Sequence, residues 1–95
     1  MDFKISPAVR HKLAQKHLVT VDEVLECFLN RDGPSFTDSR EDHQTNPPTY
    51  WFLARTDSNR LLKVIYVQYQ DHFAIKSACE ANETWIAHYA QLCGN

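Results

Sequence analysis

The stretch that decides the fold runs from Thr49 to Ala78 and reads TYWFLARTDSNRLLKVIYVQYQDHFAIKSA. Three runs in it, residues 49–56, 60–69 and 72–78, are rich in aromatic and β-branched side chains, which predicts three β-strands. Only a few polar turn residues separate neighbouring runs. Because connections this short join antiparallel strands, the stretch predicts a three-stranded meander.

The middle strand of this meander is apolar on both faces. Side chains alternate along a strand, so its apolar residues fall into two sets that point to opposite sides of the sheet. The first set is Leu62, Val64 and Tyr66, and the second is Leu61, Ile65 and Val67. Both faces should therefore be covered. Two N-terminal helices can cover one face, and either the last helix or a second chain must cover the other.

The first of these helices begins near the N-terminus. Ser6 and Pro7 form a typical N-cap and first-turn pair, because proline lacks only an N–H that has no partner at that position. The helix should run to about His17, with Val9 and Leu13 on its inner face.

A second helix follows from a capping box. Thr20 and Glu23 have the spacing at which each side chain satisfies the other residue's free backbone N–H. The apolar residues that then share one helical face are Val21, Val24, Leu25 and Phe28. This helix should end near Arg31, because the Asp-Gly-Pro run that follows cannot continue it.

Shorter elements complete the predicted fold. Residues 3–5 and 35–38 have the character of short extended segments, and residues 80–92 predict a closing helix. The side chains expected on the inner side of that helix are Trp85, Ile86 and Tyr89. The whole chain is thus predicted to be one α+β domain, with two N-terminal helices, an antiparallel sheet of about four strands and a C-terminal helix.

Composition narrows the functional classes. The 95 residues carry a formal charge of −2, which argues against a broad nonspecific grip on nucleic acid but leaves room for a local basic site. Three cysteines without metal-ligand spacing predict reduced thiols and a cytoplasmic location. The histidines form no metal-binding pair, and neither a secretory signal nor a membrane span is expected. No metal or other cofactor is therefore expected.

The densest polar stretch lies in the loop before residue 49. His43 is suited to acid–base chemistry because its unperturbed pKa lies near neutrality. Asp42 beside it would orient the imidazole, and Arg40 would bind an anionic group such as phosphate. The alternative is that these side chains only cap turns.

Cations on the strands suggest a second surface. The cations on, or just before, the predicted strands are Arg55, Arg60, Lys63 and Lys76, and those that face the same way on neighbouring strands can form a cationic patch. Arg55 and Lys63 are candidates for binding an RNA phosphate, with Lys76 as a further candidate substrate-binding residue. Trp51 and its neighbour Tyr50 are candidates for stacking on bases. The alternative is that the long cationic side chains cover the sheet rim and keep their charged ends in water.

The order of these segments resembles the BrnT toxin family. The resemblance is carried by residues 16–24 with Phe28, by the strand pair 51–55 and 60–66, and by the strand at 75–78. It implies a small ribonuclease with a RelE-like fold that needs no metal and is held inactive by an antitoxin partner. Where that family carries arginines, this chain has Cys79-Glu80-Ala81-Asn82. A ribonuclease uses cations there to offset phosphate charge, so the carboxylate of Glu80 disfavours cleavage, and the alternative is a relative that has lost cleavage.

A further run matches a narrower group. Arg40-x-Asp42-His43-x-x-x-Pro47-Pro48-Thr49-x-Trp51, with the later Glu80 and Asn82, resembles short bacterial proteins named ADP-ribosyl-(dinitrogen reductase) hydrolase. Glu80 and Asn82 thereby join the candidate substrate-binding residues, although either also fits a helix N-cap. The remaining alternative is a noncatalytic module that binds an antitoxin-like protein, or a second copy of itself, through an apolar sheet face.

Overall fold

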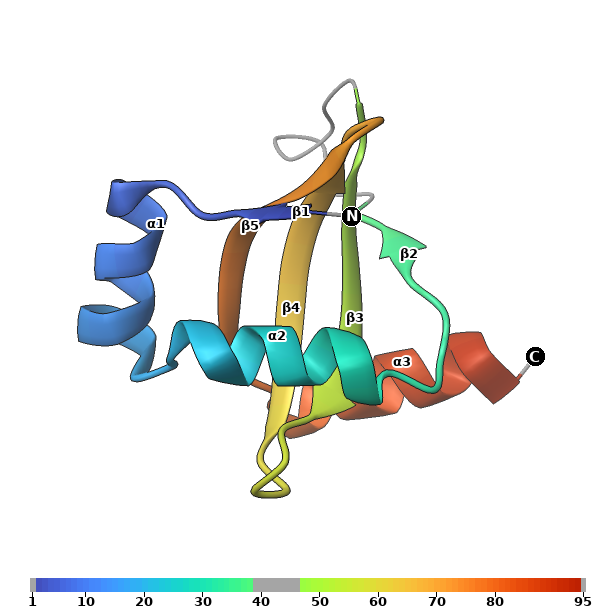
Figure 1. Ribbon diagram of the computed structural model, residues 1–95. Helices are drawn as coiled ribbons and strands as arrows, with labels where there is room; N and C mark the ends of the chain where they lie inside the picture. The colour runs from blue at the N-terminus through green and yellow to red at the C-terminus, as the bar shows by residue number, and fades with distance from the viewer. Residues whose placement is uncertain (1, 39–46, 95) are drawn as a thin grey trace.

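The computed structural model describes residues 2–38 and 47–94, which form a five-stranded sheet with helices on both sides (Figure 1). The strands are β1 (Asp2–Lys4), β2 (Phe36–Thr37), β3 (Thr49–Arg55), β4 (Leu61–Gln68) and β5 (His72–Glu80). The helical elements are α1 (Pro7–Lys12), the π-helical turn η1 (Leu13–His17), α2 (Val21–Asn30) and α3 (Glu83–Gly94). The predicted α+β class is confirmed.

The meander forms as the sequence predicts. In the spatial order β1-β5-β4-β3-β2, the central strand β4 pairs antiparallel with β3 and with β5. Lys76 is the extra residue at a bulge in β5, because Ile65 pairs with Ser77 while Tyr66 pairs with Ile75. The bulge changes the alternation along β5 and leaves Lys76 exposed.

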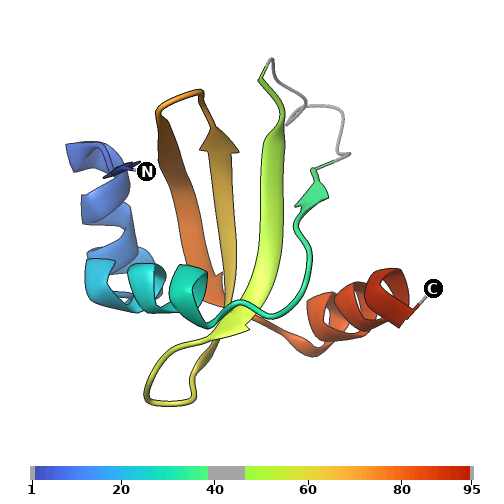
Figure 2. The same cartoon turned by 45° about the vertical axis from the view of Figure 1, so that its right-hand side comes forward.

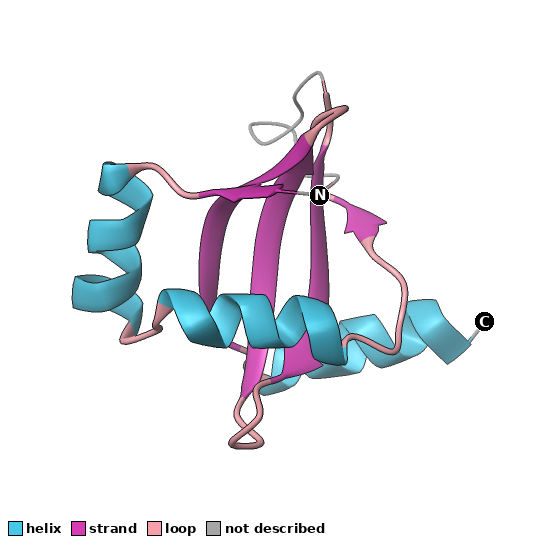
Figure 3. Cartoon of the chain, viewed as in Figure 1, coloured by secondary structure: helices cyan, strands magenta, loops and turns pink. Residues whose placement is uncertain are grey.

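The sheet differs from the expectation in its first strand. β1 lies at the edge and pairs in parallel with β5, so the sheet has five strands and is mixed rather than purely antiparallel. Figure 3 draws the strands in magenta and the helices in cyan. Aromatic packing holds β1 in place. The Phe3 ring stacks on Phe73 at a centroid distance of 5.3 Å and meets the edge of Phe28 at 4.8 Å.

The N-terminal helices cover one side of the sheet, here called the inner face. Leu13, Val24 and Cys27 are fully buried there against Phe52 and Leu62 from the strands. Cys27, which the sequence analysis did not place on the inner side of α2, lies in this core. The capping box at the start of α2 is present as predicted, with both of its hydrogen bonds.

The C-terminal helix covers the opposite side, here called the outer face (Figure 2). β5 continues to Glu80 and α3 starts only at Glu83, so the helix begins three residues later than expected. None of its described residues is fully buried, so α3 lies on the sheet more loosely than α2 does. No helix within the described part of the chain is long and apolar enough to cross a bilayer.

Candidate functional site

A cluster of aromatic and cationic side chains lies between α3 and the outer face. The pairing of Leu53 with Lys63 and of Trp51 with Ile65 places Trp51 and Lys63 on the same side of neighbouring strands. Trp85 and His88 come from α3 and meet them there. Trp51, Lys63, Trp85 and His88 are called the outer-face cluster below.

Trp51 forms the floor of this cluster. Its ring meets the edge of Trp85 at a centroid distance of 5.0 Å and stacks on the His88 imidazole at 5.7 Å. Because these side chains cover it, Trp51 is only 4% exposed. Its predicted role in stacking on RNA bases would therefore require α3 to move. Tyr50 points to the inner face, where it stacks on Tyr66.

Lys63 is buried under α3, with only 5% of its surface exposed. Its Nζ lies 3.0 Å from the centroid of the Trp85 ring and 5.5 Å from that of Trp51. An ammonium group taken out of water needs compensation, and the indole face is the most favourable aromatic surface for it. Lys63 therefore links the sheet to α3 and does not offer its charge to an exposed RNA strand.

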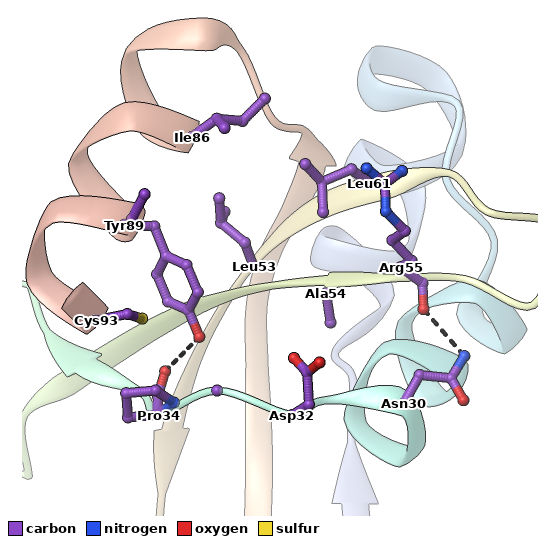
Figure 4. A pocket seen from close by; sticks show the side chains of 12 residues that line it. Asn30, Asp32, Pro34, Leu53, Ala54, Arg55, Leu61, Ile86, Tyr89 and Cys93 are labelled. Atoms are coloured by element: carbon purple, nitrogen blue, oxygen red, sulfur yellow. Dashed lines mark hydrogen bonds between the residues drawn. The ribbon is translucent and has the colours of Figure 1, made fainter.

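Two hollows open along the line where α3 meets the sheet. The smaller, about 300 Å³, lies beside the outer-face cluster and is lined by Phe36, Thr37, Asp38, Trp51, Trp85, His88 and Leu92. The larger, about 760 Å³, lies between α3 and the segment that follows α2 (Figure 4). In Figure 4 Ile86, Tyr89 and Cys93 face Leu53 and Leu61 across this larger groove, whose walls are mainly apolar.

Tyr89 closes one end of the larger groove. Its hydroxyl donates a hydrogen bond of 2.7 Å to the carbonyl oxygen of Pro34 (Figure 4). Burial, and then the nearby Cys93 thiol, raise the pKa of Tyr89 to about 12. The phenol therefore stays neutral at physiological pH and acts as a hydrogen-bond donor that ties α3 to the segment after α2.

Arg55 stands at the wall of the same groove and is exposed. Its Nη1 donates to the carbonyl oxygen of Asn59 at 3.0 Å, across the β3–β4 turn. Arg55 and Lys63 face the same side of the sheet, as the sequence analysis expected of a cationic patch. Only Arg55 is accessible, since α3 covers Lys63.

Glu80 and Asn82 both have structural contacts. A carboxylate oxygen of Glu80 accepts from Arg60 Nε at 3.0 Å. The side-chain oxygen of Asn82 accepts from the Trp85 backbone N–H at 3.0 Å, which is the N-cap arrangement that the sequence analysis gave as an alternative. Neither residue belongs to the outer-face cluster.

Lys76 lies on β5 next to the N-terminal helices. Its carbonyl oxygen accepts a 3.3 Å hydrogen bond from Lys12 Nζ. The structure thus brings together Trp51 and Lys63 among the predicted site residues and places Lys76 in a different neighbourhood. Arg40, Asp42 and His43 lie outside the described residues.

Sequence reasoning did not identify the contact of His88 and Trp85 with Trp51. The available signal was the helical spacing of Trp85, His88 and Tyr89, which places three rings along one side of α3. That spacing does not say which strand residues the rings meet.

Comparison with models of known protein families gives no match, and no curated protein is similar in sequence to this chain. Within residues 2–38 and 47–94, no group of three or more His, Cys, Asp and Glu side chains is arranged to hold a metal ion. All three cysteines are unpaired thiols, with Cys27 buried and Cys93 exposed.

Proposed function

We propose that the chain is a cytoplasmic BrnT/RelE-like toxin-family domain, directed at RNA and controlled by a partner protein. The observation that carries this proposal is the arrangement of its elements. Two N-terminal helices cover one face of the β3–β4–β5 meander and a single C-terminal helix covers the other. The order and layering agree with what the resemblance to that family implies.

The charges of the described residues limit where RNA chemistry can take place. Lys63 is covered by α3, and Arg60 is bound to Glu23 and Glu80. Among the strand cations named in the sequence analysis, Arg55 and Lys76 are exposed and accessible to a phosphate. In this proposal they assist binding and do not perform the chemistry.

The chemistry itself is assigned to the loop residues of the sequence analysis. His43 acts as the acid–base residue, Asp42 orients the His43 imidazole, and Arg40 binds the phosphate. An RNA 2′-hydroxyl attacking the neighbouring phosphate needs a base for its proton and an acid for the leaving oxygen. Both roles can be filled by side chains alone, so the proposal requires no metal.

Expression in a bacterial host tests this assignment. Induction should arrest growth and shorten cellular RNA, and His43→Ala should restore growth while keeping the same thermal melting curve. His11→Ala is the matched control, because His11 is an exposed histidine on α1 that has no role in the proposal. If the unchanged chain is expressed without harm and cellular RNA stays intact, ribonuclease activity is contradicted. The remaining form of the proposal is then a family member that has lost cleavage.

A noncatalytic interaction module is the second candidate, and the loosely covered outer face favours it. α3 has no fully buried residue, and the groove beside it measures about 760 Å³ with mainly apolar walls. An antitoxin-like protein, or a second copy of the chain, would bind there. Copurification of one defined partner would support this candidate, whereas a monomer that captures none would contradict it. Release of ADP-ribose from a modified protein would instead favour the ADP-ribosyl-(dinitrogen reductase) hydrolase relationship.

A further inference from the structure

Positive charge is concentrated at the N-terminal end of the chain. Residues 3–19 contain Lys4, Arg10, Lys12 and Lys16 but no aspartate or glutamate. The chain has 10 Lys and Arg against 12 Asp and Glu, so the rest of it holds six of these cations and all twelve acids. The formal charge of −2 therefore conceals a basic end on an otherwise acidic molecule.

The fold brings a further lysine to this end. α1 and η1 lie against β5, and Lys12 Nζ donates to the Lys76 carbonyl oxygen at 3.3 Å. Lys16 is one helical turn beyond Lys12 and is exposed, as is Lys76. Lys12, Lys16 and Lys76 are called the basic face below.

Two of the three lysines of this face, Lys12 and Lys16, act on His17. Burial, followed by the positive charges of Lys12 and Lys16, lowers the pKa of His17. Two lysines thus act on the same point, which agrees with their placement on one side of the helix. The backbone oxygen of His17 is bound by Arg60 at 3.4 Å.

The composition of the supporting helices favours a polyanion over a protein partner. Within α1 and η1 no large apolar side chain is exposed, since Leu13 is buried and Val9 is packed against the core. Leu18, directly after η1, is 74% exposed, but it is a single aliphatic side chain and not an aromatic anchor. Protein interfaces draw most of their energy from buried apolar and aromatic anchors. Binding to phosphates needs only cations, because it is driven by release of counterions from the nucleic acid.

We propose that the basic face binds the phosphate backbone of RNA without reading its sequence. This inference rests on the proposed RNA-directed function and deepens it. It extends the contact already assigned to Lys76 on β5 by adding Lys12 and Lys16 from the N-terminal helices. Lysine ammonium groups are compact point charges that suit individual phosphates. Apart from its two histidines, the α1–η1 segment has no aromatic ring that could stack on a base. The lysine contacts therefore position the RNA backbone and do not select a base sequence.

Salt-dependent binding tests this inference directly. All proteins carry His43→Ala so that RNA is not cut, and the probe is a short fluorescent single-stranded RNA whose anisotropy is followed from about 50 to 200 mM salt. Replacing Lys12 and Lys16 with glutamine should reduce the slope of log affinity against log salt by about 1.4, because each lost phosphate contact removes about 0.7. Lys16→Gln alone, which leaves the Lys12 hydrogen bond intact, should give about half of that change.

Arginine at both positions is the matched control, because it keeps the charge and should keep the slope. An unchanged slope in the glutamine variants, or an equal loss in the arginine variant, would overturn the inference. Binding of polyglutamate as tight as that of RNA would overturn it in favour of an acidic protein. If the unchanged chain arrests growth but the glutamine substitutions leave the salt slope unchanged, only the role of the basic face is refuted. If RNA binding depends on these lysines but the unchanged chain does not arrest growth, only the ribonuclease activity is refuted.

Discussion

Arg60 Nη1 lies 3.2 Å from each carboxylate oxygen of Glu23, and this contact joins the sheet to the start of α2. The same guanidinium donates to the carbonyl oxygen of Leu18 at 2.8 Å and to Glu80 at 3.0 Å. Glu23 in turn accepts the backbone N–H of Thr20. One arginine therefore links the end of η1, the capping box of α2 and the end of β5.

Replacing Arg60 with alanine should lower the free energy of unfolding by about 2 kcal/mol, the range for a hydrogen bond to a charged group. The Glu80 contact should contribute little of this, because that side chain is 68% exposed. Arg60→Lys keeps the charge but cannot reach all partners, so it should recover only part of the loss. Urea unfolding measures both variants, and equal stability of Arg60→Ala and the unchanged chain would contradict the role of this contact.

Glu23 should make stability depend on pH in the acid range. The hydrogen bond from Thr20, and then the Arg60 contacts, lower the pKa of Glu23 below its usual 4.5, although burial opposes them. A carboxylate with a lowered folded pKa stabilises the fold above its unfolded pKa, and this stability is lost as pH falls through the folded pKa. Below pH 4.5 the free energy of unfolding of Glu23→Gln should therefore depend less on pH than that of the unchanged chain. Asp22→Asn, a change to an exposed neighbour in the same helical turn, is the matched control.

Trp85 should control the exposure of Trp51. Trp85→Ala removes the ring that covers both Trp51 and Lys63, and the half-buried position suggests a loss of about 2 kcal/mol, below the range for a fully buried Trp. Trp51 is then the only tryptophan, and its fluorescence should shift to longer wavelength. Trp85→Phe also leaves Trp51 alone but keeps a ring over it, so its emission should stay blue-shifted. Identical emission from the two variants would show that α3 does not cover Trp51.

Tyr89 and Gly33 should be energetically coupled. A Cβ added at Gly33 would lie 2.5 Å from the Tyr89 hydroxyl oxygen, so Gly33→Ala should push this side chain away from Pro34. Tyr89→Phe should cost about 1 kcal/mol for the lost hydrogen bond. In the phenylalanine background Gly33→Ala should cost clearly less than it does alone. Strictly additive losses in a double-mutant cycle would contradict the contact.

Tyr89→Phe should also change how stability and tyrosine ionisation depend on pH in the alkaline range. Because the folded pKa of Tyr89 is raised to about 12, its contribution to stability is present below pH 10 and is lost as pH rises toward 12. The ultraviolet titration of the folded chain should lose its latest phenolate step in Tyr89→Phe. Persistence of that step would assign it to another tyrosine.

The three thiols should react in a definite order. Cys93 is exposed, Cys79 is partly buried and Cys27 is buried with its Sγ 3.6 Å from the Ala54 carbonyl oxygen. Burial, and then the charges of Glu23 and Glu26, raise the pKa of Cys27 to about 12, which suppresses its reactive thiolate. Mass spectrometry after iodoacetamide treatment should find Cys93 labelled first and Cys27 last. Early labelling of Cys27 in the folded chain would contradict its burial.

Local patterns in the sequence determined most of the elements of this protein. The alternating apolar residues of β4, the short turns beside it and the Thr20–Glu23 capping box each act over a few residues, so they could be recognised without a structure. The class of the fold and the two-sided burial of β4 followed from them. Asn82 at the start of α3 was recognisable as a cap for the same reason.

Tertiary structure alone decided which distant residues meet. The parallel pairing of β1 depends on Phe3 reaching Phe73, and the burial of Lys63 depends on Trp85 lying above it. In the sequence Lys63 is an ordinary strand cation, and only the docking of α3 removes it from solvent. Contacts of this kind depend on how whole layers pack, because a side chain's burial and partners are set by segments far away in the chain.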